Sequence, residues 1–169
     1  MSLEAAIEQA IEYEKRVLGV YERAVAKAPD DMGRRVFQSL ADEEAGHVAY
    51  LEHRLDELRR SGGVTDAPLD TVVPSARAIA EGIHRVEETV DRPDRDFELD
   101  LLRQALAAEE ETSAFYERMV AELGPEGQAL FARFLEIEHG HRAIVQAEID
   151  ALNGTGFWFD FAEFNLEAG

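Results

Sequence analysis

The stretch Glu44-Ala45-Gly46-His47 returns 94 positions later as Glu138-His139-Gly140-His141. In each copy the glutamate and the final histidine stand three residues apart, a spacing that places both side chains on one face of a helix. A further glutamate precedes each copy: Glu14 in the first half of the chain and Glu109 in the second, 95 positions apart. The chain therefore repeats a unit in which one helix offers a carboxylate and the next helix offers a carboxylate and an imidazole.

The two halves together supply four carboxylates and two imidazoles, which is the ligand set of a two-metal centre inside a four-helix bundle. Tyr21 follows Glu14 by seven residues, and Tyr116 follows Glu109 by the same interval. Seven residues are about two helical turns, so each tyrosine shares a face with its glutamate. Each tyrosine is expected to pack in the core with its hydroxyl satisfied by a neighbour, or to hydrogen-bond a ligating carboxylate on a facing helix. The two roles are compatible.

Apolar residues recur at helical spacing in four long segments, over about 3–28, 32–60, 97–123 and 125–152. Proline, glycine and aspartate interrupt the pattern between these segments, and Asp30 or Asp31 is suited to cap the second one. The first and second segments, like the third and fourth, are joined by only a few residues, so each pair is expected to form an antiparallel hairpin.

The sequence thus predicts an all-α fold, an antiparallel four-helix bundle over 1–153 built from two helical hairpins. A crossover over 61–92 joins the hairpins and carries a weaker amphipathic helix over 75–90. Residues 154–169 form an aromatic tail, dense in phenylalanine around Trp158. The tail is expected to cover the chain's own bundle, to dock on a second subunit, or to target the protein to a larger assembly.

The four glutamates and two histidines lie on the core-facing stripe of their segments, near the middle of each helix. Ionised carboxylates converging in an apolar core would repel one another and lose hydration, so cations or protons must compensate them. Two divalent cations would do so, and bridging carboxylates would hold them roughly 3.5–4 Å apart. The candidate metal ligands are Glu14, Glu44, His47, Glu109, Glu138 and His141.

Other acids and histidines fall off this stripe and are interpreted as ordinary surface residues. Glu110 or Glu111 would replace Glu109 if the helical phase were misjudged, but the tyrosine spacing favours Glu109. His139 points roughly 100° away from Glu138 on a helix and is expected to be exposed. The remaining residues placed on the surface are Glu8, Glu12, Glu22, Glu43, His53 and His84.

Composition narrows the classes of function. The chain has no cysteine, so it has no disulfide, thiolate or iron–sulfur chemistry and offers only oxygen and nitrogen donors to a metal. Its formal charge of -19 repels phosphate, which argues against nucleic acid as a partner. The apolar runs are too short to cross a membrane, and the first residues lack the pattern of a secretory leader, so a cytoplasmic protein is expected.

At these residues the chain resembles the rubrerythrin-like branch of the ferritin-like superfamily, over about 3–152. The resemblance implies a left-handed antiparallel bundle with a carboxylate-bridged di-iron or di-manganese centre. Matching motif to motif assigns the six candidate ligands to the metals. The activity it implies is peroxide reduction or oxidation of Fe(II), with O2 or H2O2 as the oxidant.

The chain departs from the rubrerythrin pattern in two ways. The absence of cysteine excludes the rubredoxin-like domain that delivers electrons, so a reductant would have to come from an external donor. Many rubrerythrins also carry an extra glutamate one turn after the third-helix ligand, where this chain has Thr112. The second departure favours a symmetric centre nearer to the ferroxidase pattern.

We therefore expect a non-haem di-iron oxidoreductase, assembled as a homo-oligomer with a dimer favoured. Two alternatives belong to other classes: a non-catalytic iron carrier or sensor, and a helical interaction protein whose site holds zinc or nothing.

Overall fold

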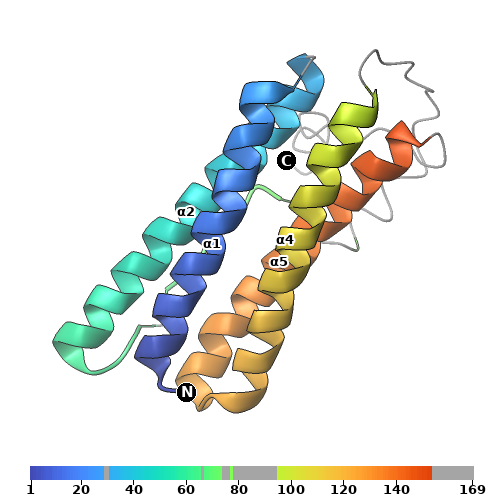
Figure 1. Ribbon diagram of the computed structural model, residues 1–169. Coiled ribbons are helices and arrows are strands. Elements are labelled where there is room, and N and C mark those ends of the chain that lie inside the picture. The colour runs from blue at the N-terminus through green and yellow to red at the C-terminus, as the bar shows by residue number, and fades with distance from the viewer. Residues whose placement is uncertain (29–30, 66, 74–76, 78–94, 154–169) are drawn as a thin grey trace.

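The computed structural model describes the chain except residues 29–30, 66, 74–76, 78–94 and 154–169. Within the described residues it has four helices and no strand (Figure 1). The helices are α1 (Leu3–Lys27), α2 (Asp31–Ser61), α4 (Arg95–Glu122) and α5 (Pro125–Leu152). Their bounds lie within two residues of the expected segments, so the all-α class is confirmed. Most of the helix expected over 75–90, and the whole tail over 154–169, lie outside the described residues.

The helix ends follow from local sequence. The Ser2 side chain accepts a hydrogen bond from the Ala5 backbone N–H at 3.2 Å and so caps α1. α2 ends where Gly62 adopts a φ of 81°, a conformation that glycine reaches without a steric penalty. Pro125 opens α5, where a backbone N–H would have no helical partner in any case.

The helices associate as two adjoining pairs, visible side by side in Figure 1: α1 packs against α2 and α4, and α4 packs against α5. Arg59 near the end of α2 lies 2.7 Å from Glu4 at the start of α1, which locates the helices relative to each other. Arg16 of α1 pairs with Glu111 of α4 at 2.6 Å. These side chains are about half exposed, so the ion pairs indicate how the helices are aligned but contribute little to stability.

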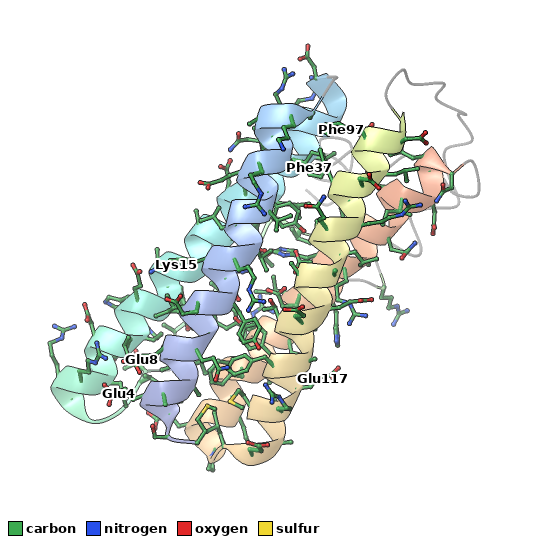
Figure 2. The ribbon with its side chains drawn as sticks, in the orientation of Figure 1. Glu4, Glu8, Lys15, Phe37, Phe97 and Glu117 are labelled. Atoms are coloured by element: carbon green, nitrogen blue, oxygen red, sulfur yellow. The ribbon has the colours of Figure 1, made fainter. Side chains whose placement is uncertain are left out.

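Two apolar clusters fill the interior, one toward each end of the bundle. The first, called the Phe37 cluster, includes buried residues between Val17 and Ala28, at the end of α1, and the first buried apolar residues of α4. Phe37 itself is 1% exposed, whereas Phe97 is 43% exposed (both labelled in Figure 2). The second, called the Phe131 cluster, includes Ala6–Ile11 of α1 and the last buried residues of α4.

Between the two clusters, each helix has a stretch that contains none of the fully buried members of either cluster: 12–16, 42–50, 106–114 and 138–143. These four stretches lie at the same level of the bundle and contain all six candidate ligands. The fold thus encloses a polar layer between two apolar ones. In the part of the chain that the structure describes, no helix combines the length and apolarity needed to cross a membrane.

Candidate metal centre

The polar layer holds four acids and two histidines that are shielded from solvent. Glu14 comes from α1, Glu44 and His47 from α2, and Glu109 from α4; Glu138 and His141 come from α5. His47 is 1% exposed and the other five are 0% exposed. The structure therefore brings together every residue that the sequence predicted as a ligand, although they span more than a hundred positions of the chain.

The six residues form two overlapping groups of four, in each of which one possible ligand atom from every residue lies within 4.8 Å of the others. One group joins Glu14, Glu44, His47 and Glu138, and the other joins Glu44, Glu109, Glu138 and His141. Glu44 and Glu138 belong to both groups. Each group therefore has one glutamate and one histidine of its own, and two glutamates that it shares. Such a buried cluster can hold metal ions.

Each histidine turns its Nδ1 atom toward the carboxylates. His47 Nδ1 lies 3.1 Å from Glu14 Oε2 and 3.4 Å from Glu44 Oε2. His141 Nδ1 lies 2.7 Å from Glu44 Oε1 and 3.6 Å from Glu109 Oε1. The two rings are stacked, with centroids 5.4 Å apart and planes inclined by 7°. This arrangement presents two parallel imidazoles, one to each group of carboxylates.

Many polar atoms of the centre have no hydrogen-bond partner. These atoms are both carboxylate oxygens of Glu44 and of Glu138, Oε2 of Glu109, Nε2 of His47 and both ring nitrogens of His141. The short distance from His141 Nδ1 to Glu44 is therefore a close approach without hydrogen-bond geometry. Buried polar groups are normally paired, and a site built to bind an ion is one accepted reason for an exception. A set of oxygen and imidazole donors suits iron, manganese or zinc.

Two tyrosines each reach from their own helix to a candidate ligand on another helix, Glu109 or Glu14. Tyr21 of α1 donates a hydrogen bond to Glu109 of α4, and Tyr116 of α4 donates one to Glu14 of α1. Both tyrosines are 0% exposed and also pack in the apolar clusters. Both roles expected from the sequence are thus present, with each tyrosine serving the glutamate of the other half.

Without metal, protons take over part of the charge compensation. Burial and the negative charge of Glu44 raise the pKa of Glu14 to about 8. Burial, followed by the charges of Glu109 and Glu14, raises the pKa of Glu138 well above its ordinary value. Burial alone would lower the pKa of His47, but Glu44 and Glu14 outweigh it and raise that pKa to about 10. Burial would likewise raise the pKa of Glu44, yet the two imidazoles lower it. The metal-free centre therefore holds protons at neutral pH.

Most of the acids interpreted as surface residues are exposed, among them Glu110 and Glu111, so the helical phase that selected Glu109 is confirmed. His53 and His139 are exposed as expected, and His84 lies outside the described residues. Glu43 is the exception. Only 9% of its side chain is exposed, and its carboxylate faces Nε2 of His141 at 3.9 Å. Sequence periodicity missed Glu43 because it lies off the apolar stripe of α2.

Comparison with known proteins bears on the fold alone. A hypothetical protein from Pyrococcus furiosus has a similar structure, with a TM-score of 0.64, 23% sequence identity and 94% of each chain covered. No protein-family model and no curated protein matches the chain. The fold and the site thus define a class, a helical bundle with a buried glutamate–histidine cluster that could bind metal.

Proposed function

We propose that this protein is a ferritin-like, rubrerythrin-type oxidoreductase whose antiparallel bundle holds a two-metal carboxylate centre, most suited to iron. In this proposal it reacts with O2 or H2O2 and oxidises Fe(II) or an external donor. The observation that carries the proposal is the pair of overlapping ligand groups, each with its own glutamate and histidine and with Glu44 and Glu138 in common.

The proposal assigns each residue a place. Glu14 and His47 would hold one ion, Glu109 and His141 would hold the other, and Glu44 and Glu138 would bridge them. Two divalent ions would balance four carboxylates that are costly to bury otherwise. The unpartnered oxygens and ring nitrogens support this assignment, since they are the atoms that such ions would occupy.

Bound iron would supply the electrons that reduce O2 or H2O2. The chain's own contribution is to position and enclose it. Tyr21 and Tyr116 hold the terminal carboxylates by hydrogen bonds, which fixes their orientation toward the centre. The two apolar clusters exclude bulk water from both ends of the polar layer, so charges there interact more strongly than in water.

Thr112 bears on which oxidation the centre favours. Its side chain is 0% exposed, and its hydroxyl donates to the backbone oxygen of Ala108 at 3.0 Å. The hydroxyl is thus engaged with its own helix, and no further carboxylate stands at this position. This supports oxidation of Fe(II) over the rubrerythrin type of peroxide reduction.

A second function, an iron carrier or sensor without turnover, is favoured by one specific observation. All six candidate ligands are 0–1% exposed. A catalytic metal needs an open coordination position that substrate can reach, and ligands buried this deeply give a dissolved oxidant little direct access to a bound ion. Access of O2 or H2O2 to the loaded centre therefore separates the two functions.

The test is anaerobic loading with Fe(II), followed by rapid mixing with O2 or H2O2 while absorbance is recorded. The proposal predicts uptake of about two ions per chain and fast oxidation. Tight binding without oxidation would support the carrier. Glu44→Ala and Glu138→Ala should lose two-metal binding, and Glu110→Ala, an exposed acid one residue from a ligand, should keep it. Unchanged stoichiometry in both ligand variants would refute the site.

A further inference from the structure

The two copies of the internal repeat differ in the residue that stands just before the first candidate ligand of each Glu-x-x-His motif. In both copies a candidate-ligand glutamate stands three residues before the candidate-ligand histidine. The residue immediately before that glutamate differs between the copies: it is Glu43 in α2 and Ile137 in α5. Ile137 is 3% exposed and belongs to the Phe131 cluster. Glu43 instead places a carboxylate at the edge of the polar layer. The two halves of the centre are therefore chemically different although their candidate ligands match.

Glu43 is held firmly in place by the segment that follows α2. Its Oε2 accepts a hydrogen bond from the Thr71 hydroxyl at 2.5 Å, and its Oε1 accepts one from the Val72 backbone N–H at 2.9 Å. The Thr71 hydroxyl also accepts from the Val73 N–H at 3.0 Å. Residues 71–73 thus form a bracket that orients the Glu43 carboxylate.

The bracketed carboxylate points to the outer nitrogen of one histidine. Glu43 Oε2 lies 3.9 Å from His141 Nε2, and that nitrogen has no other partner. His141 turns its Nδ1 to the ligand cluster, so Nε2 is the nitrogen that must carry the proton when Nδ1 binds a metal. This separation exceeds the upper end of the N–H···O hydrogen-bond range by about 0.7 Å, so a hydrogen bond forms if the two groups approach by that amount.

Glu43 also has a carboxylate oxygen within 4.8 Å of a ring nitrogen of His47, but of the two histidines only His141 comes within 4.0 Å of Glu43. The outer nitrogen of His47 has no acid at the repeat-related position of α5. It is buried and unpartnered, and the ring edge meets Phe134 at a centroid distance of 5.4 Å. A carboxylate behind a ligating imidazole fixes its tautomer and orientation and strengthens it as a ligand, and loss of such a partner typically costs about 10–100-fold in metal affinity. Glu43 approaches His141 more closely than His47, so this arrangement favours the His141 side of the centre.

We propose that Glu43 is a positioning residue for His141 and makes the two metal positions unequal, so that the position bounded by Glu109 and His141 fills first and binds more tightly. This inference rests on the proposed two-metal centre. It adds an order of loading to that centre and links the order to residues 71–73, which hold Glu43.

The experiment titrates the metal-free protein with Zn²⁺, a redox-inactive probe, by calorimetry against a competing chelator. The wild-type chain should bind two ions in two resolved steps. Glu43→Gln should keep two ions but weaken the tighter step about 10–100-fold and leave the other unchanged. Asp42→Asn is the matched control, because it removes the same charge from an exposed neighbouring residue and should change neither step.

Nitrogen NMR of the zinc-loaded protein supplies a second readout. The Nε2–H signal of His141 should shift in Glu43→Gln while the signal of His47 stays in place, a selectivity that a general loss of packing would not produce. Thr71→Val keeps the carboxylate but removes one of its donors, and should weaken the same step to a smaller extent. Thr71→Val also decides the question if Glu43→Gln fails to fold, since an unchanged titration would then overturn the proposal.

The outcomes separate this inference from the function on which it rests. Failure of the wild-type chain to bind two ions would overturn the two-metal centre itself. Two equal steps in the wild type, or equal weakening of both steps in Glu43→Gln, would leave the centre standing and overturn the role of Glu43. A fall to one ion in Glu43→Gln would also overturn it, because Glu43 would then be a ligand.

Discussion

Tyr21 of α1 donates its hydroxyl hydrogen bond to Glu109 of α4, the glutamate of the other half of the repeat. Tyr116 of α4 donates the equivalent hydrogen bond to Glu14 of α1. The two bonds join α1 to α4 at the level of the buried cluster, so the tyrosines connect the helical pairs as well as orient the carboxylates. A buried carboxylate that loses such a donor remains desolvated without compensation.

Tyr21→Phe and Tyr116→Phe should therefore each destabilise the metal-free protein by about 1–3 kcal/mol, measured by denaturant unfolding. Each should also weaken binding of the ion held by the glutamate it contacts, Glu109 or Glu14 respectively, about 10–100-fold. Tyr13→Phe is the matched control, since Tyr13 stacks on Phe115 and lies only partly buried on α1. Native stability and metal affinity in both buried variants would show that the hydroxyls do not hold the carboxylates.

Glu138→Gln should separate stability from metal binding. The raised pKa of Glu138, caused by burial and by the charges of Glu109 and Glu14, favours the protonated side chain in the metal-free protein, and glutamine matches that form in size and charge. We expect the metal-free variant to be at least as stable as the wild type at pH 7, and to lose two-metal binding because Glu138 belongs to both ligand groups. Paired denaturation and metal-binding curves would check this, and a strongly destabilised metal-free variant would contradict it. Glu110→Gln should change neither property.

The metal-free protein should lose stability as the pH rises through neutrality. The folded-state pKa of Glu14 is raised from 4.5 to about 8, so its unfolded form releases a proton first and stability falls between those values. The folded-state pKa of His47 is raised from 6.5 to about 10, so its contribution is complete below pH 6.5 and is lost as the pH approaches 10. Denaturation midpoints at pH 6, 7.5 and 9 should decline in that order. Glu14→Gln should flatten the lower part of the decline.

Helical phase accounts for how much of the fold and the candidate site could be predicted from the sequence. The apolar stripe that predicted four helices also placed Glu109, and not Glu110, in the interior, because one residue on a helix changes direction by about 100°. The exposed Glu110 and the buried Glu109 agree with that reasoning. Local periodicity was therefore sufficient to identify a candidate ligand wherever that residue lies on the same stripe as its apolar neighbours.

Glu43 could not be predicted in this way, because its environment comes from distant parts of the chain. Its burial depends on Thr71 and Val72, in a connection without periodicity, and on His141 of α5. The hydrogen bond from Tyr21 to Glu109 could be predicted only in part, since the sequence indicated a partner carboxylate on a facing helix but did not identify which one. Contacts between distant parts of the chain decided both cases.

The two glycines Gly46 and Gly127 should respond in opposite ways to alanine. Gly46 lies exposed inside α2, and a methyl group there would meet nothing within 4 Å. Gly46→Ala should stabilise the protein by up to about 1 kcal/mol through helix propensity. Gly127 is buried in the first turn of α5, where a Cβ would lie 2.8 Å from Leu123 and 3.2 Å from Leu3. Gly127→Ala should destabilise it by about 1–3 kcal/mol through overpacking.

Thermal unfolding of the two metal-free variants would test whether Gly46→Ala stabilises and Gly127→Ala destabilises the protein. Titration with Zn²⁺ would test whether the Gly46 substitution changes metal affinity. Gly46 stands between two candidate ligands, Glu44 and His47, yet its alanine variant should keep native metal affinity, because the added methyl group faces solvent while both ligands face the interior. A loss of affinity in Gly46→Ala would mean that the Glu44–His47 turn needs a distorted backbone to bind metal. Stabilisation with unchanged affinity would mean that an undistorted helix presents both ligands.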